Sequence, residues 1–268
     1  MKFSTSFGSG DEVLYEEVEV EEGRNVAYLT LNRPEKRNAL SMEMLNALCD
    51  AIDEASRKEV RTIVIKGAGK CFSAGHDLRE IREGDEREVR TIFENCYRLM
   101  RKIRLIPKPV IAQVHGYAVA AGCQLVAACD MAVAAESTKF SLPGVRIGLF
   151  CTTPLAVVSR SIGRKKAFEM AFTGEMIDAK EAERIGLVNR VVKDEELEKE
   201  VFELAKKLST FSRSVIERGK EFFYKQYCMN EFDALLYGID VIVEMSREEA
   251  AKEGLSAFLE KREPRWPD

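Results

Sequence analysis

The 268-residue sequence predicts an α/β protein with a helical C-terminal region. Short strand patterns alternate with amphipathic helix patterns as far as residue 193, and only helical periodicity follows from Glu195 onward. No low-complexity linker and no internal repeat divides the chain. These observations favour one α/β core over residues 11–193, continuous with helices over 194–268 and long enough to bury a sizeable hydrophobic interior.

Composition excludes several classes of protein. The chain is 46% apolar and 32% charged with a net charge of −4, so it lacks the basic excess typical of nucleic-acid binding. No apolar run has membrane-spanning length, and the first residues lack the apolar core of a signal peptide. Seven singly spaced cysteines without a CxxC motif indicate free thiols, so we expect a cytosolic protein. With two histidines, we expect no metal site.

The elements of the first half follow from alternation and capping signals. Residues 1–10 are rich in Ser and Gly and are expected to be flexible. Strands are predicted over 13–22 and 25–32, with a turn at Glu22-Gly23, and Ser41 is the predicted N-cap of a helix over 42–58. A buried strand over 61–67 and a loop over 68–78 come next. A long amphipathic helix over about 85–105 is then ended by Pro107 and Pro109.

The second half begins with a strand over 110–116 and a loop that enters a helix. Short strands are predicted over 131–136 and 138–142, helices over 153–163 and 164–174, an Asp178-capped helix over 179–186, and a strand over 187–192. Four helices follow, over 195–209, 214–228, 231–245 and 247–262. Their apolar surface is large for a chain end, so part of it is expected to pack against another subunit.

Two small-residue loops have the same local pattern. "FSAGHDL" (72–78) and "YAVAAGCQL" (117–125) each follow a strand and lead into a helix. Such junctions leave backbone N–H groups unpaired at the positive end of a helix dipole, and two converging N–H groups form an oxyanion hole. The pattern alone is more simply that of two tight turns.

Longer motifs resemble one known family. "NRPEKRNALS", "FSAGHDL", "KPVIAQVHGYAVAAGCQLVAACD", "FSLPGVRIGL" and "FTGEMIDAKEAERIGLVNRVV" occur in the order and spacing of the crotonase superfamily, the enoyl-CoA hydratase/isomerase family. The match spans residues 15–262, and "SAGHDL", "PGVRIGLFCTTP" and "AFLEKREPRW" are most similar to its mitochondrial enoyl-CoA hydratase domain-containing subgroup. The resemblance implies a spiral of ββα turns and C-terminal helices that form trimers or pairs of trimers.

The same resemblance implies a function in fatty acid metabolism. Crotonase-like lyases and isomerases bind acyl-CoA thioesters as substrates, need no further cofactor, and hold the thioester enolate in an oxyanion hole. By position, the two donors here are the backbone N–H groups of His76 and Ala121, although the family usually has glycine at the position of Ala121. The positions implied for coenzyme A are Lys36, Arg37, Ala39, His76, Asp77, Leu78, Arg79, Phe258 and Lys261, the last two often reaching a neighbouring subunit.

Some of these positions have simpler interpretations. Lys36 and Arg37 equally fit an ordinary solvated loop. Asp77 more simply caps the following helix. The family role of His76 is through its backbone, but its side chain has a pKa suited to proton transfer. Cys151 could act as a nucleophile, yet a thiol that only lines the site is the simpler interpretation.

The sequence departs from the family at its acid–base positions. Gln124 and Gly144 stand where hydratases have two glutamates, and Thr152 stands where some relatives have an aspartate. Glutamine cannot exchange a proton near neutral pH, so we expect hydration to be weak or absent. The alternatives are decarboxylation or thioester hydrolysis that needs only the oxyanion hole, or a non-catalytic acyl-CoA-binding regulatory protein. Restoring glutamate at both positions is expected to distinguish them.

Overall fold

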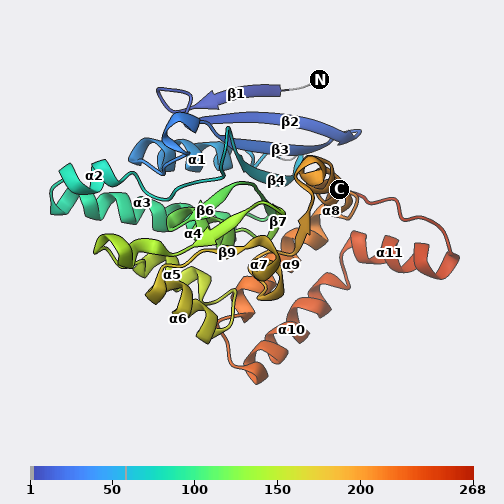
Figure 1. Cartoon of the computed structure of the whole chain (residues 1–268). Helices are drawn as coiled ribbons and strands as arrows, with labels where there is room; N and C mark the ends of the chain where they lie inside the picture. The colour runs from blue at the N-terminus through green and yellow to red at the C-terminus, as the bar shows by residue number, and fades with distance from the viewer. Residues whose placement is uncertain (1–2, 58) are drawn as a thin grey trace.

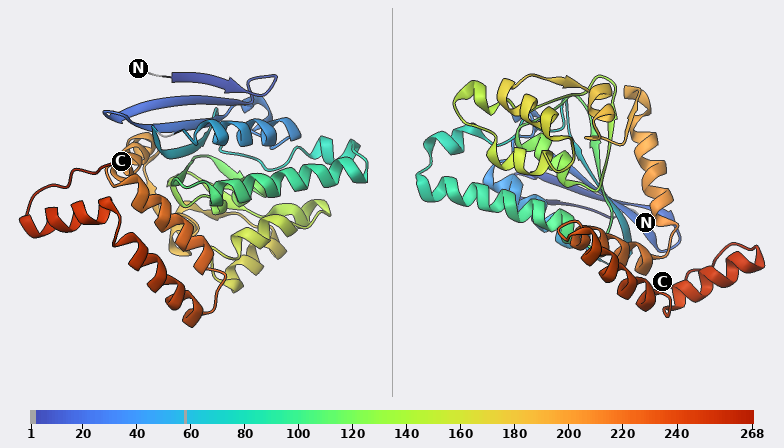
Figure 2. Two further views of the ribbon diagram at one scale, coloured as in Figure 1. Left: turned by 180° about the vertical axis from the view of Figure 1, so that it is seen from behind. Right: turned by 90° about the horizontal axis from the view of Figure 1, so that it is seen from below.

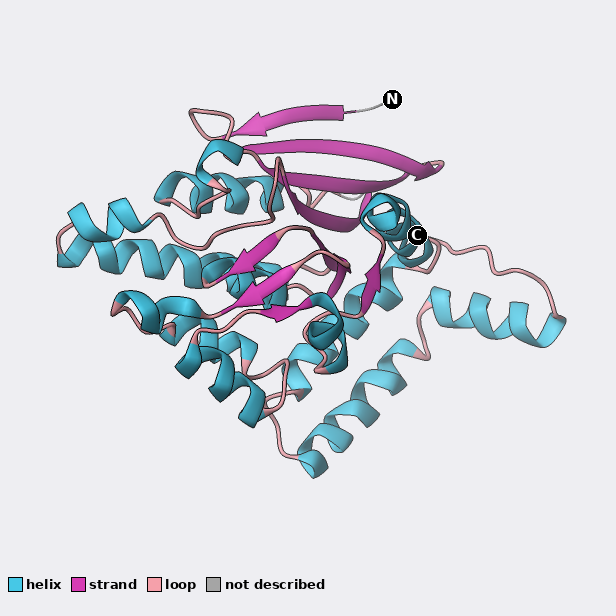
Figure 3. Ribbon diagram, viewed as in Figure 1, coloured by secondary structure: helices cyan, strands magenta, loops and turns pink. Residues whose placement is uncertain are grey.

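The computed structural model describes residues 3–57 and 59–268, and a seven-stranded sheet forms its centre (Figures 1 and 3). The neighbours run β1–β2–β3–β4–β5–β7–β10. Their bounds are β1 Phe3–Phe7, β2 Val13–Glu21, β3 Arg24–Leu31, β4 Val60–Gly67, β5 Val110–Val114, β7 Met131–Ala135 and β10 Arg190–Val192. The β1–β2 and β2–β3 pairs are antiparallel, and every later pair is parallel.

A second, three-stranded sheet is made of β6 (Tyr117–Val119), β8 (Lys139–Ser141) and β9 (Ile177–Asp178). The chain passes from β5 into β6, through helix α4 (Ala121–Ala128), and back to the large sheet at β7. It therefore turns repeatedly through two strands and a helix while it winds between the sheets. This arrangement confirms the predicted α/β spiral of ββα turns.

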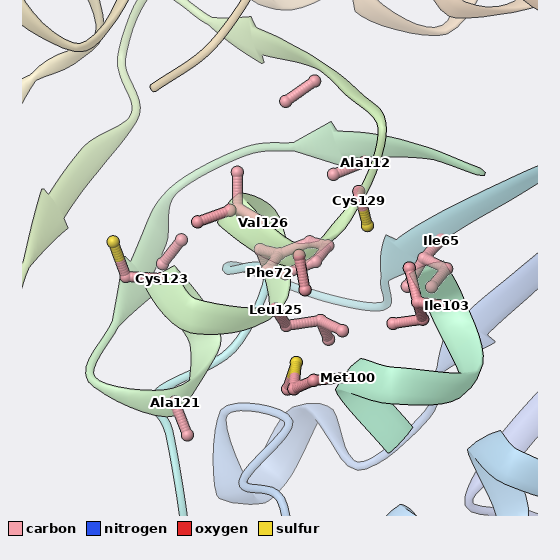
Figure 4. Packing of buried hydrophobic residues seen from close by; sticks show 14 of the residues in the cluster. Ile65, Phe72, Met100, Ile103, Ala112, Ala121, Cys123, Leu125, Val126 and Cys129 are labelled. Carbon is pink, nitrogen blue, oxygen red and sulfur yellow. The ribbon is translucent and has the colours of Figure 1, made fainter. Parts of the chain in front are cut away.

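Period-two alternation gives each face of the large sheet its own apolar layer. Ile63 and Ile65 of β4 pack in the main core with α1 (Met42–Glu54) and α3 (Glu86–Leu105). Val64 faces the opposite layer, beneath α8 (Leu197–Ser209). Helix α4 is buried along its whole length, and Figure 4 shows its Leu125 and Val126 among Phe72, Met100 and Ile103.

The remaining helices are α2 (Leu78–Glu83), α5 (Thr152–Val158), α6 (Arg164–Thr173), α7 (Ala179–Arg184), α9 (Arg213–Gln226), α10 (Glu231–Met245) and α11 (Glu249–Glu260). Helices α10 and α11 project from the body as an arm, clear in both views of Figure 2. The chain after α11 returns to the body, where the Asp268 carboxylate accepts a 2.7 Å hydrogen bond from the Ser214 N–H.

Several local predictions were wrong. Residues 3–7 form β1 instead of a flexible segment, because the rings of Phe3 and Phe7 pack edge-on against Tyr15, 5.8 and 6.0 Å away. The helix predicted over 42–58 ends at Glu54, and residue 58 lies outside the described residues, as do residues 1–2. The helix predicted over 153–163 spans Thr152–Val158. Helix α2, capped by Asp77, comes between the predicted loop over 68–78 and the predicted helix over about 85–105.

Two further observations concern residues 3–57 and 59–268 only. No helix there is long and apolar enough to cross a membrane, and no cluster of three or more His, Cys, Asp or Glu side chains could hold a metal ion. The seven cysteines carry free thiols, six of them buried and Cys228 exposed.

Candidate functional site

A largely apolar cavity of about 780 Å³ lies between the loop after β4, the β6–α4 junction, and the segment from Pro143 to Pro154. Apolar side chains from α2, α3 and this segment make up most of its wall. The cavity brings together six of the predicted site residues: His76, Leu78, Ala121, Gly144, Cys151 and Thr152. A concave apolar site with a few polar groups is the usual form of a small-molecule site.

The two small-residue loops meet at this cavity because glycine allows their backbones to touch. Gly75 has φ +89°, and a Cβ atom placed on it would lie 3.1 Å from the Ala121 nitrogen. A Cβ atom on Gly122 would lie 2.4 Å from the Ser73 carbonyl oxygen. The loops are also joined by a 3.1 Å hydrogen bond from the Ser73 N–H to the Tyr117 carbonyl.

Two backbone donors are left free at this junction. The Leu40 N–H donates to the Gly75 carbonyl and the Asp77 N–H to the Leu40 carbonyl, so the backbone hydrogen bonds on either side skip the His76 N–H. Ala121 is the first residue of α4, where an N–H has no partner inside the helix. Within the described chain, neither of these two N–H groups donates to another backbone group. Both could donate to one oxygen atom in the cavity.

The His76 side chain is held in one orientation. Its Nδ1 lies 3.3 Å from the Leu40 carbonyl oxygen, which can only accept, so Nδ1 carries the hydrogen of the neutral ring. The ring of Phe93 packs edge-on at 5.0 Å. Nε2 is buried and has no hydrogen-bond partner among the described residues. Burial lowers the pKa of His76, so the ring is neutral at pH 7.

Gln124 does not lie in the cavity wall. It is 3% exposed in the middle of α4, and its Oε1 accepts a 3.9 Å contact from the Cys96 thiol of α3. The side chain is therefore part of the packing between α3 and α4. A polar residue occurs in this apolar run because its amide finds a partner on the neighbouring helix.

Gly144 lies against Cys151. The Gly144 N–H donates to the Cys151 Sγ at 3.3 Å, and a Cβ atom at residue 144 would lie 2.0 Å from the Leu149 carbonyl oxygen. The local backbone therefore excludes any side chain here. This corrects the expectation that glutamate could simply be restored at position 144. Burial raises the pKa of the Cys151 thiol, so it stays protonated at neutral pH and is a weak nucleophile.

Thr153 is a cavity residue that was not predicted from the sequence. Thr152 is exposed at the start of α5, whereas the Oγ1 of Thr153 is buried and has no hydrogen-bond partner among the described residues. Both threonines line the cavity. The only signal in the sequence is the Thr-Thr pair itself, and the orientation of α5 decides which hydroxyl is turned inward.

The residues predicted for coenzyme A fall into two groups. Lys36 and Arg37 are exposed on a loop fastened beside the cavity, since the Ala74 N–H donates to the Arg37 carbonyl at 3.0 Å, and Ala39 lies on the same loop. Asp77 caps α2 through the Arg79 N–H at 3.1 Å, as the simpler interpretation held.

Phe258 and Lys261 form the second group, at the end of α11. Helix α11 lies on the projecting arm (Figure 1). Phe258 is 81% exposed there, and neither residue lines the cavity of its own chain. The structure therefore does not unite them with the other predicted site residues within one chain.

Comparison with known proteins gives consistent matches. The family model described as enoyl-CoA hydratase/isomerase matches residues 21–268. Enoyl-CoA hydratase domain-containing protein 3 of Mus musculus is 44% identical over 240 residues, which cover 89% of this chain and 80% of the relative. The human protein of that name is 43% identical over 240 residues, which cover 89% of this chain and 79% of the human protein.

Solved structures agree with the sequence matches. A crystal structure of enoyl-CoA hydratase from Mycobacterium smegmatis has a TM-score of 0.92 at 42% identity and covers 96% of this chain and 99% of its own. The crystal structure of human enoyl-CoA hydratase domain-containing protein 3 has a TM-score of 0.90 at 40% identity. The match covers 94% of this chain and 99% of the human chain. Both the crotonase-like fold and the predicted subgroup are confirmed.

One prediction is overturned by these names. The relatives from mouse, rat, human and Xenopus laevis are all named as mitochondrial proteins. The expectation of a cytosolic protein was therefore wrong. It rested on free thiols and on the lack of a signal peptide, and neither feature separates the cytosol from other reducing compartments.

Proposed function

This chain belongs to the enoyl-CoA hydratase/isomerase family, and on that premise we propose that it binds acyl-CoA thioesters and stabilises their enolates. The thioester oxygen is held by the backbone N–H groups of His76 and Ala121. The observation that carries the proposal is that these two N–H groups are unpaired where the loops meet at the cavity. Preformed donors aimed at a developing oxyanion lower the barrier by several kcal/mol, about 3 for a single donor.

The surroundings of the cavity suit the two ends of such a ligand. The apolar wall takes the acyl group, and the exposed cationic side chains of Lys36 and Arg37 take the phosphates of coenzyme A. The apolar arm supports assembly into a homotrimer or a pair of trimers, in which Phe258 and Lys261 reach the ligand of a neighbouring subunit.

The proposed function does not include the addition of water to an enoyl thioester. Adding water to an enoyl thioester needs groups that activate the water and deliver a proton. Gln124 is a buried amide outside the cavity wall, and residue 144 has no room for a carboxylate. An enzyme of enolate chemistry other than hydration is therefore favoured.

Calorimetric titration with butyryl-CoA and with butyryl-pantetheine tests the binding proposal. Wild type is expected to bind both, and Lys36→Ala/Arg37→Ala is expected to bind butyryl-CoA about tenfold more weakly, a loss of about 1.4 kcal/mol. The pantetheine thioester lacks the nucleotide phosphates, so its affinity is expected to stay unchanged.

The matched control is Lys199→Ala/Lys207→Ala, which removes two exposed cations from α8 on the far face of the sheet. It is expected to leave both affinities unchanged. A wild-type protein that binds neither thioester would refute the proposal. Rapid hydration of crotonyl-CoA, detected by mass spectrometry, would refute its reaction class.

A further inference from the structure

One charged side chain lines the otherwise apolar cavity. Within the described chain, no aspartate or glutamate lines the cavity, and Arg146 is the one lining residue that is charged at pH 7. The His76 ring is neutral because burial lowers its pKa, and the Cys151 thiol is protonated because burial raises its pKa. The cavity therefore combines an apolar wall with a single positive charge.

The local structure holds the Arg146 side chain in place. Arg146 belongs to a 3₁₀ helix, η2 (Pro143–Ile147), which begins at a proline and ends at Gly148 with φ of +72°. Its Nε–H donates to the Thr173 carbonyl at the end of α6, 3.3 Å away. A Cβ atom on Gly174 would lie 3.2 Å from the Arg146 Cγ, so the glycine leaves room for the aliphatic stem. The stem is thereby held between η2 and the end of α6.

The rest of the guanidinium has no protein partner. Within residues 3–57 and 59–268, Arg146 forms no ion pair, and the bond from Nε is its one side-chain hydrogen bond. The acidic residues near Thr173 do not neutralise it: Glu169 is paired with Lys166 at 2.7 Å, and Glu175 is exposed and forms no ion pair with Arg146. The side chain itself is exposed. Its Nη1 and Nη2 atoms therefore keep their N–H donors for another acceptor.

We propose that the acyl group bound in this cavity carries a second carboxylate, at the end remote from the thioester, and that Arg146 binds it. The ligand is then the monothioester of a dicarboxylic acid. The inference rests on the proposed function, because it requires an acyl thioester in the cavity. It adds the chemical class of the acyl group and a residue that selects it.

The chemistry of the cavity favours a carboxylate as the partner of Arg146. A guanidinium matches a carboxylate with two parallel, charge-assisted hydrogen bonds. Against an apolar wall such a pair is screened less than in water, and no acidic side chain of the wall competes for it. Thr152 also lines the cavity and is exposed, so its hydroxyl can donate to the same anion.

The position of Arg146 suits the far end of the acyl group. The proposed oxyanion donors lie where the two small-residue loops meet, and the Ala120 N–H joins that place to the Ser141 carbonyl at 2.9 Å. The chain then runs from Ser141 through Pro143 and Gly144, which both line the cavity, to Arg146. Methylene groups can follow this lined segment from the thioester to the guanidinium. A carboxylate separated from the thioester by several methylene groups is therefore expected.

The test is calorimetric titration with three pairs of pantetheine thioesters: glutaryl with valeryl, adipoyl with hexanoyl, and suberoyl with octanoyl. The two members of a pair have equal numbers of acyl carbons and differ in the terminal carboxylate. Pantetheine lacks the nucleotide phosphates of coenzyme A, so binding of Arg146 to a phosphate cannot contribute. Wild type is expected to bind the dicarboxylic member of at least one pair about tenfold more tightly, a difference of about 1.4 kcal/mol.

Arg146→Met removes the charge and keeps an apolar stem. It is expected to weaken binding of the preferred dicarboxylic thioester by about tenfold or more, because the carboxylate would lie against an apolar wall without a counter-charge. The affinity for the neutral member of the pair is expected to stay within about threefold. The matched control is Arg164→Met. Arg164 is exposed, lies outside the cavity wall, and is separated from Thr173 by the length of α6, about 14 Å. This control is expected to leave both affinities unchanged.

Two results would overturn the inference: wild type that binds the neutral member of every pair as tightly as the dicarboxylic member, or more tightly, and an Arg146→Met variant that keeps the wild-type preference. Wild type that binds no member of any pair would instead refute the proposed function. If Arg146→Met does not fold, the terminal amide of the preferred dicarboxylic thioester decides in wild type. Removing the charge of the ligand must then weaken binding by about tenfold, and an unchanged affinity would contradict the ion pair.

Discussion

Ala120 has the most unusual backbone conformation at the candidate site. Its φ of 50° and ψ of −119° lie in a region that glycine adopts easily and alanine adopts at a cost of about 1–3 kcal/mol. Its N–H donates to the Ser141 carbonyl at 2.9 Å, and its carbonyl accepts from the Gln124 N–H at 3.0 Å. Hydrogen bonds therefore hold the backbone on both sides of the Ala120 Cα. The strained residue directly precedes Ala121, whose N–H is one of the two proposed oxyanion donors.

We therefore expect Ala120→Gly to stabilise the protein by about 1 kcal/mol, since relief of strain exceeds the added flexibility of the unfolded chain. Urea denaturation measures the free energy of unfolding. The control is Ala127→Gly in the same helix, where φ is helical and glycine is expected to destabilise by about 1 kcal/mol or more. A loss of stability in both variants would show that Ala120 is not strained.

Gly144 shows why a missing catalytic group cannot always be put back. Because a Cβ atom there would meet the Leu149 carbonyl at 2.0 Å, even Gly144→Ala is expected to destabilise by more than about 2 kcal/mol. Gly163→Ala is the matched control, with φ of −64° and open space around its Cβ position, and should be nearly neutral. Thermal unfolding compares the two, and equal melting temperatures would contradict the steric argument.

At the scale of elements, α9 is fastened to the body by one largely buried ion pair. The Lys220 Nζ donates to the Asp130 carboxylate at 2.6 Å and to the carbonyls of Ile103 and Lys108 at 2.8 and 2.7 Å. The Tyr224 hydroxyl donates to the other carboxylate oxygen at 2.7 Å. Burial lowers the pKa of Lys220, and Asp130 opposes that shift. These bonds hold the helix from which the projecting arm continues.

Lys220→Met is expected to destabilise by about 2–3 kcal/mol, because it leaves the largely buried Asp130 carboxylate without its counter-charge. Hydrogen exchange should show faster opening of α9 than of α1. Arg218→Met, on the same helix, removes an exposed pair with Glu244 and should cost less than about 1 kcal/mol. Similar losses in the two variants would mean that the buried pair does not fasten α9.

At the scale of the whole molecule, the arm exposes more apolar surface than a monomer usually shows. Phe232, Leu236, Ile239 and Ile242 of α10 and Leu255, Phe258 and Leu259 of α11 are each more than half exposed in the single chain. Helices that bury so few of their own apolar residues gain little stability alone. A surface of this kind fits contact with further copies of the chain.

Sedimentation is therefore expected to give the mass of a trimer or of two trimers for wild type. Leu255→Asp/Leu259→Asp should yield monomers, because two carboxylates would be desolvated in the interface. Lys252→Ala, on the same helix but charged and exposed, should keep the wild-type mass. A wild-type protein that sediments as a monomer would refute the assembly.

The α/β class, most helices and strands, the family and the two loops of the site could be predicted from the residues alone, whereas the short strands β1, β6 and β9 were missed. The predicted features depend on local periodicity, on glycine and cap positions, and on motif order, which are written along the chain. The pairing of residues 3–7 with β2 was missed because two aromatic rings among serines give little local signal until Tyr15 lies beneath them.

What each site position can do depends on contacts that form only in the folded chain. The tertiary structure turned Gln124 toward Cys96, closed position 144, chose Thr153 rather than Thr152 for the buried hydroxyl, and left Nε2 of His76 without a partner. Each of these outcomes depends on contacts of a few ångströms between segments far apart in sequence. Side-chain direction and steric room are set by that packing, so the residue types alone could not reveal them.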